Sequence, residues 1–166
     1  MSKEQTADLK KFLKPFNDRI KELALWLRAF VWDLYPEANE LIYDNYNAVA
    51  FGWSLSDKLS DTFCSVAVNT DKYVHFGFYW GSKIPDPEKI LLGKGNQYRY
   101  IKVSNKKEFP KAYIQKLVNE AYVYSLSKMK EKDQTLKGAT IVKSISATKR
   151  RPGSTPPKKE VQKKKG

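Results

Sequence analysis

The chain has 166 residues and 41% hydrophobic content, which is enough for one domain with a substantial core. No apolar run approaches the roughly 18 residues of a membrane span, and the opening residues MSKEQTADLKKFLK lack the apolar core of a signal peptide. The only cysteine, Cys64, excludes an internal disulfide and fits a buried thiol within a strand. These features predict a cytoplasmic protein with no membrane segment.

The net charge of +13 is divided unevenly along the chain. Residues 1–134 carry 21 Lys and Arg against 17 Asp and Glu, a net of +4, whereas residues 135–166 carry 10 against 1, a net of +9. A nearly balanced domain with a basic tail differs in kind from a basic domain. We therefore expect a folded domain at 1–134 and a disordered tail at 135–166, although residues 139–147 alternate weakly and could pair as a strand.

Hydrophobic residues at three-and-four spacing predict helical structure from Asp8 to Tyr35. Pro15 divides this stretch into a short helix ending near Lys14 and a longer helix with the proline in its first turn. The next residues, 36–46, are too polar for a core element and are expected to form a connection.

Alternation of apolar and polar residues predicts strands at 49–55, 62–68, 72–80 and 98–103. The first three are joined by short polar turns and therefore form an antiparallel meander, which the fourth joins after a proline-rich excursion. A last helix is expected within 105–128, with Pro110 in its first turn. The expected fold is α+β, with an antiparallel sheet of four to five strands packed by N- and C-terminal helices.

The strand at 72–80 separates two kinds of side chain by face. Its core face carries Val74, Phe76, Phe78 and Trp80. Its other face carries Tyr73, His75 and Tyr79. Together with Tyr43, these polar aromatic residues could line a pocket for a small ligand. The alternative is that His75 is a hydrogen-bonded structural residue.

A short glycine-rich loop offers a candidate anion site. Gly93, Lys94 and Gly95, followed by Arg99, would place exposed backbone N–H groups beside two cations. The loop is not a P-loop, because the longer spacing and the terminal Ser or Thr are absent. The alternative is a tight turn that binds nothing.

The candidates for metal binding are carboxylates. A single histidine without a cysteine partner excludes a zinc site of the ordinary type. Glu37, Glu40 and Asp44 have three-and-four spacing, so on a helical turn they would share a face and could hold a hard cation weakly. The alternative is a solvated surface.

Five motifs occur in an order that resembles the YdhG-like domain family. They are E-x-x-Y, K-x-V-H-F-x-F, G-x-x-I-P-D-P, LLGKG and R-x-I-x-V, found here at Glu40 to Tyr43, Lys72 to Phe78, Gly81 to Pro87, Leu91 to Gly95 and Arg99 to Val103. The similarity covers roughly residues 18 to 128. It implies an α+β fold with a curved antiparallel sheet, in a family mostly without assigned biochemistry. One bacterial member is described as a frataxin-like iron chaperone, so the resemblance makes iron a possible cofactor.

No catalytic arrangement is recognisable, because the chain has no nucleophile elbow, no suggestive Cys–His pair and no Rossmann glycine pattern. We therefore expect a non-catalytic binding module for a small molecule, an anion or iron, as a monomer or, through an exposed edge strand, a dimer. The alternative is that the tail binds nucleic acid or another acidic surface, or only aids solubility. The tail residues that would bind phosphate are Lys149, Arg150, Arg151, Lys158, Lys159, Lys163, Lys164 and Lys165.

Overall fold

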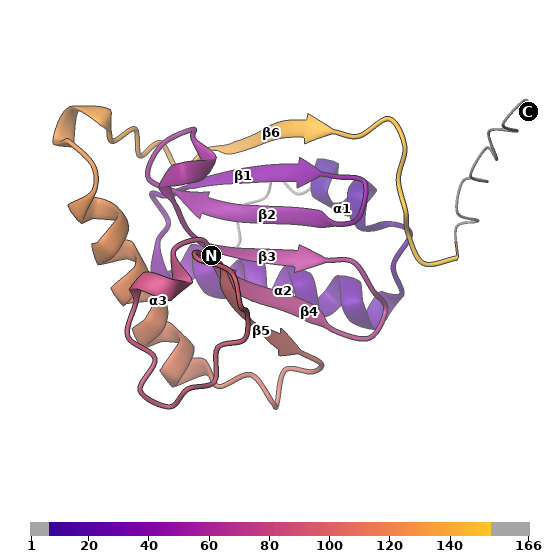
Figure 1. The fold of residues 1–166 in the computed structure, drawn as a ribbon. Coiled ribbons are helices and arrows are strands. Elements are labelled where there is room, and N and C mark those ends of the chain that lie inside the picture. The colour runs from indigo at the N-terminus through magenta and orange to yellow at the C-terminus, as the bar shows by residue number, and fades with distance from the viewer. Residues whose placement is uncertain (1–6, 154–166) are drawn as a thin grey trace, which may run out of the picture.

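The computed structural model describes residues 7–153, and within this range six strands form one open sheet with the order β5-β4-β3-β2-β1-β6 (Figure 1). The strands are β1 (Asn39–Asp44), β2 (Val49–Ser54), β3 (Thr62–Val68), β4 (Val74–Phe78), β5 (Arg99–Val103) and β6 (Thr140–Ile145). The α-helices are α1 (Ala7–Leu13), α2 (Asp18–Leu34) and α3 (Lys111–Ser127). Short 3-10 turns are η1 (Leu59–Asp61), η2 (Gly81–Lys83) and η3 (Glu131–Asp133). The α+β class predicted from the sequence is confirmed.

The helices lie where the hydrophobic spacing predicts them, but the start of α2 differs. Pro15 lies in the turn between α1 and α2 and not in the first turn of α2. The side chain of Asn17 accepts a hydrogen bond from the backbone N–H of Ile20 at 2.9 Å and so caps the helix. The start of α2 is therefore set by the N-cap residue Asn17 and not by Pro15.

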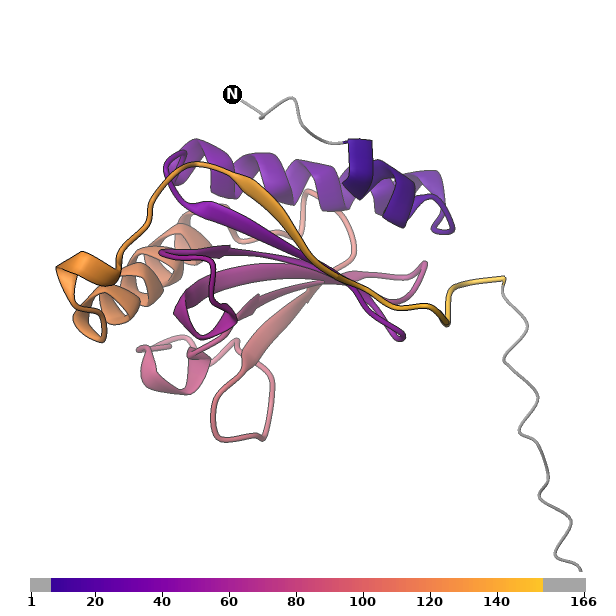
Figure 2. The ribbon, with the colours of Figure 1, turned by 90° about the horizontal axis from the view of Figure 1, so that it is seen from above.

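Strands β1 to β5 pair antiparallel in chain order, so the predicted meander is confirmed. Large side chains from its inner face are fully buried, among them Phe51, Trp53, Phe76 and Phe78. Helix α2 packs on this face, and α3 packs beside it against β3 (Figure 2). None of the helices in residues 7–153 lies over the opposite face of the sheet, which we call the open face (Figure 2).

Two segments correct the sequence analysis. Residues 39–44, expected as a connection, form the strand β1. Residues 140–145, assigned to the tail, form β6, which pairs parallel to β1. The described sheet is therefore mixed and has six strands, whereas an antiparallel sheet of four to five was expected.

The reason for both errors is that polar groups in these segments are paired with each other. The N–H of Glu40 donates to the carbonyl of Ala139 at 2.8 Å, and the N–H of Ser146 donates to the carbonyl of Asp44 at 2.7 Å. Backbone hydrogen bonding between strands requires no apolar side chains, so a composition argument misses it. The domain boundary expected at residue 134 is thus wrong for residues 140–145, which belong to the folded sheet. Residues 154–166, including Lys158, Lys159, Lys163, Lys164 and Lys165, lie outside the described part of the chain.

Among residues 7–153, every helix is too short or too polar to cross a lipid bilayer.

Candidate functional site

The open face has a floor of small side chains in the middle of the sheet. The register places Ala50 opposite Ala67 and Gly52 opposite Ser65, and Ser65 in turn lies opposite Gly77. Directly opposed residues in an antiparallel pair share a face, so these five form one continuous surface across β2, β3 and β4. The ring of Tyr98 covers the Gly77 end of this floor.

Four aromatic side chains form a row along one side of this floor, and we call it the aromatic row. The ring centroids of Tyr73 and His75 are 5.4 Å apart, those of His75 and Tyr100 are 4.6 Å apart, and those of Tyr100 and Tyr98 are 5.6 Å apart. The planes differ by only 10°, 28° and 17°, so each ring is stacked on the next. The row joins β4 to β5 on the open face.

Sequence reasoning identified Tyr73 and His75 but missed Tyr98 and Tyr100. The signal that could have found them is the alternation of Tyr98, Tyr100 and Lys102, which places these side chains on the same face of one strand. The register then sets Tyr100 opposite Gly77 and Lys102 opposite His75.

Tyr98 lies across the sheet over Gly77. A Cβ atom at Gly77 would overlap the tip of the Tyr98 ring, so glycine is required for this close approach. Burial raises the pKa of Tyr98 to about 12, although its hydrogen bond with the Ser65 side chain acts in the opposite direction. The phenol therefore keeps its proton at neutral pH and remains a hydrogen-bond donor.

His75 is partly buried within the row. Its Nε2 atom has no hydrogen-bond partner among residues 7–153, and burial together with the charge of Lys102 lowers the pKa of the imidazole. The Lys102 ammonium lies 4.7 Å from the centroid of the Tyr73 ring, within cation–π range. The aromatic row is thus a neutral surface with a positive charge beside it. The alternative, in which His75 is a hydrogen-bonded structural residue, does not fit an Nε2 atom that is unpaired in the described part of the chain.

Tyr43 and Tyr79 belong to the same side of the sheet. Tyr43 lies opposite Ala50 in the register, and burial raises the pKa of its phenol, with a further electrostatic contribution from Tyr79. The two tyrosines are therefore close enough to interact. All four residues expected to line a ligand site are near the open face, although the ring of Tyr79 also packs against Trp80 at 5.2 Å.

The glycine-rich loop has a geometry that favours a turn over an anion site. Arg99 Nη1 donates to the carbonyl of Gly95 at 2.6 Å and to that of Tyr98 at 2.8 Å, so the guanidinium holds the loop together. Gly93 has φ of 126°, a conformation that favours glycine. Lys94 remains exposed, but the charge of Arg99 is directed at carbonyl oxygens.

The three carboxylates proposed for metal binding do not share a helical face. Glu40 is fully buried on β1 and receives two hydrogen bonds of 2.7 Å from Arg28, and Asp44 is fully buried and paired with Arg151 at 2.7 Å. Glu37 is exposed in the preceding turn. Among the described residues no group of three or more His, Cys, Asp or Glu side chains could hold a metal ion. The expectation drawn from their spacing is wrong, because cations of the protein already neutralise the two buried carboxylates.

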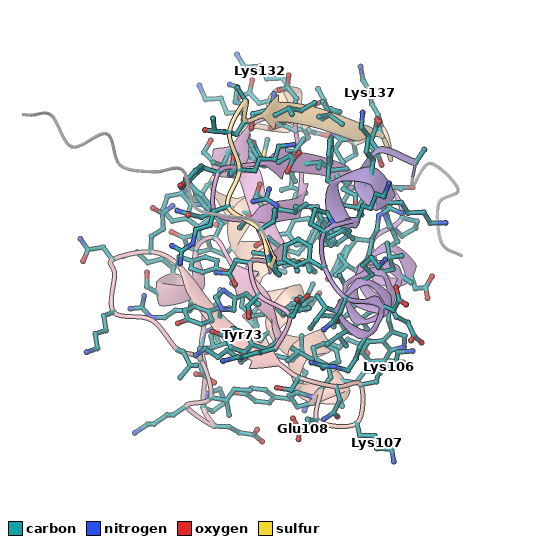
Figure 3. The ribbon with its side chains drawn as sticks, turned by 90° about the vertical axis from the view of Figure 1, so that its right-hand side faces the viewer. Tyr73, Lys106, Lys107, Glu108, Lys132 and Lys137 are labelled. Atoms are coloured by element: carbon teal, nitrogen blue, oxygen red, sulfur yellow. The ribbon has the colours of Figure 1, made fainter. Side chains whose placement is uncertain are left out.

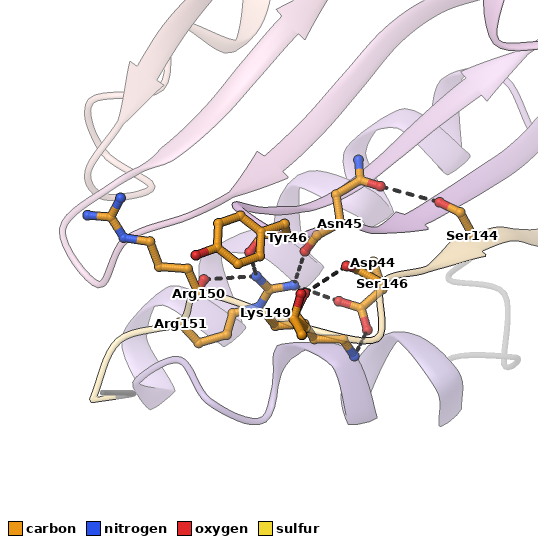
Figure 4. A network of polar contacts seen from close by, with 9 residues as sticks. Asp44, Asn45, Tyr46, Ser144, Ser146, Lys149, Arg150 and Arg151 are labelled. Carbon is orange, nitrogen blue, oxygen red and sulfur yellow. Dashed lines mark hydrogen bonds and ion pairs between the residues drawn. The ribbon is translucent and has the colours of Figure 1, made fainter. Parts of the chain in front are cut away.

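The tail cations that the structure describes have different roles. Lys149 and Arg151 both pair with Asp44, and Arg151 also donates to the carbonyls of Asn45 and Tyr46 at 2.7 and 2.9 Å (Figure 4). Arg151 is 6% exposed and therefore structural. The Arg150 side chain is exposed and points away from this network (Figure 4).

A cavity of about 660 Å³ lies beside Arg150, at the end of the sheet, and we call it the end cavity. It is assembled from the β1–β2 turn, the β3–β4 turn and the segment after β6. The described residues that line it are Asn47, Asn69, Thr70, Asp71, Lys72, Arg150, Arg151 and Pro152. Sequence reasoning missed this cavity, because its three segments are distant in the chain.

The fold and these sites define an α+β protein with a mixed sheet that helices cover on one face only. Comparison of the chain with family models, curated proteins and solved structures found no match. The resemblance to the YdhG-like family remains a prediction from the sequence.

Proposed function

We propose that this protein is a non-catalytic binding module whose ligand lies on the open face, against the aromatic row. The observation that carries the proposal is the stacking of Tyr73, His75, Tyr100 and Tyr98 beside a floor of small residues. Ligand sites are typically lined by apolar and aromatic side chains with a few convergent polar groups. Here the polar groups are phenols, a neutral imidazole and the Lys102 ammonium.

The reactive side chains of the described chain support binding over catalysis. Cys64 is fully buried, and burial raises the pKa of its thiol well above the ordinary value, so the nucleophilic thiolate is disfavoured. The carboxylates Glu40 and Asp44 are held in buried ion pairs on β1, which β2 and β3 separate from β4 and the aromatic row.

A thermal-shift search on the full chain, across nucleotides, cell metabolites and metal ions, tests the proposal, because binding to the native state raises the apparent stability. We expect at least one ligand to raise the melting temperature of the wild type and to have no effect on Tyr100→Ala. Tyr124→Ala is a matched control, since it removes a partly buried tyrosine of α3 whose ring packs on Trp80 and contacts no member of the aromatic row in the described structure. An equal response of both variants would contradict the proposal.

A further inference from the structure

We infer, building on the proposed function, that the ligand of the open face is a single-stranded nucleic acid. One backbone phosphate occupies the end cavity, and the neighbouring base lies against the aromatic row. The evidence is the charge of the end cavity, the way in which its cations are held, and the position of Lys72 in the cavity next to Tyr73 of the row.

The end cavity has an excess of positive charge. Lys72 and Arg150 line it, against the single carboxylate of Asp71 among the described residues, while the charge of Arg151, which also lines it, is already paired with Asp44. That carboxylate already accepts a hydrogen bond of 2.7 Å from the backbone N–H of Asn17. Lys72 and Arg150 form no ion pair within residues 7–153 and are therefore available to a phosphate. Hydroxyl and amide side chains on the same walls could donate further hydrogen bonds to its oxygens.

The folded C-terminal segment fixes one of these cations in place. The backbone N–H of Arg150 donates to the carbonyl of Tyr46 at 2.7 Å, and the neighbouring Arg151 is held by Asp44 (Figure 4). Arg150 is thus anchored through its main chain, while its guanidinium makes no ion pair with any described residue. A cation on a fixed backbone loses less freedom on binding than one on a disordered tail.

The end cavity and the aromatic row are joined at consecutive residues of the chain. Lys72 lines the cavity, and the next residue, Tyr73, begins the row, with the Lys102 ammonium above its ring. The open-face positions of β2 to β5 carry no acidic side chain in the described structure. Cations that follow a backbone and aromatic rings that contact bases are the two parts of single-strand binding sites. A duplex would conceal its bases and engage only the cations.

The test is fluorescence anisotropy on the full chain with a labelled oligothymidine of about 12 nucleotides, over a series of salt concentrations. We expect Arg150→Ala to weaken binding roughly fivefold at about 0.1 M salt and to reduce the salt slope by about 0.7, the contribution of one single-strand phosphate. Tyr73→Ala should weaken binding without changing the salt slope. A duplex of equal length should bind more weakly than the single strand.

The control is Lys137→Ala, which removes the same charge at the other end of the sheet. In Figure 3, which looks onto the end with the cavity, Lys137 lies at the β6 edge, away from Tyr73. Equal affinities of Arg150→Ala and Lys137→Ala, or equal binding of single strand and duplex, would overturn the inference. A third outcome would also overturn it: the protein does not bind the oligonucleotide, but a small metabolite raises its melting temperature and Tyr100→Ala abolishes that shift. This third outcome would leave the proposed function intact.

Discussion

Asp44 shows how a single residue determines the structure of the chain's C-terminal part. Its carboxylate is fully buried at the end of β1, where an unpaired charge would be strongly unfavourable. Arg151, 107 residues later, and Lys149 supply the compensating charges. The segment after β6 is therefore held by buried charge and not by apolar burial.

The two partners of Asp44 should differ in importance. We expect Arg151→Ala to lower the free energy of unfolding by about 3–5 kcal/mol, because it leaves a buried carboxylate without its buried partner. Lys149→Ala should cost about 1 kcal/mol or less, since the lysine side chain is 34% exposed. Urea denaturation of the two variants measures both effects. Similar losses would show that the two cations are equivalent.

His75 should make stability depend on pH in a predictable direction. Burial and Lys102 lower the pKa of its imidazole in the folded state, whereas the unfolded chain titrates near the ordinary value of about 6.5. The folded protein therefore binds fewer protons, and its stability is full above about pH 6.5 and falls as the pH drops through that value toward the folded pKa. His75→Phe should lose less stability than the wild type between about pH 7.5 and 5.5, measured by urea denaturation. Parallel losses would rule out His75 as the source.

At the scale of elements, the segment that leads into β6 is held against β1 by the buried side chain of Asn39. Its Oδ1 accepts from the backbone N–H groups of Lys137 and Ala139 at 3.1 and 3.3 Å, and its Nδ2 donates to the carbonyl of Thr135 at 2.5 Å. One side-chain amide thus hydrogen-bonds three backbone groups in the segment between η3 and β6.

Removal of this amide should loosen β6 selectively. Asn39→Ala leaves partly buried backbone groups without their partner, so we expect a loss of about 1 kcal/mol and faster amide hydrogen exchange across β6. Asn45→Ala is the control, because within residues 7–153 its side chain accepts a single, exposed hydrogen bond of 3.3 Å from Ser144. Unchanged exchange in β6 of Asn39→Ala would contradict this role.

At the scale of the whole molecule, C-terminal truncations at two positions separate the contribution of β6 from that of residues 154–166. Deleting residues 135–166 removes β6 and both cations of Asp44, whereas deleting 154–166 keeps every described contact. We expect residues 1–153 to melt within a few degrees of the full chain, and residues 1–134 to melt far lower or to lack a cooperative transition, by circular dichroism. A cooperative melt of 1–134 at the full-chain temperature would show that β6 contributes little.

The sequence by itself determined the α+β class, the helices and the four strands of the meander, because hydrophobic period is a local property of the chain. It also separated Phe76 from His75 by face and thereby located half of the aromatic row. Only the tertiary structure decided that residues 39–44 are a strand and that residues 140–145 extend the sheet. Residues 39–44 pair with β2 on one side and with β6 on the other, and the contacts with β6 include hydrogen bonds and ion pairs between residues about 100 positions apart, which no local period records. The end cavity depends on the same long-range contacts, which bring Arg150 beside Lys72.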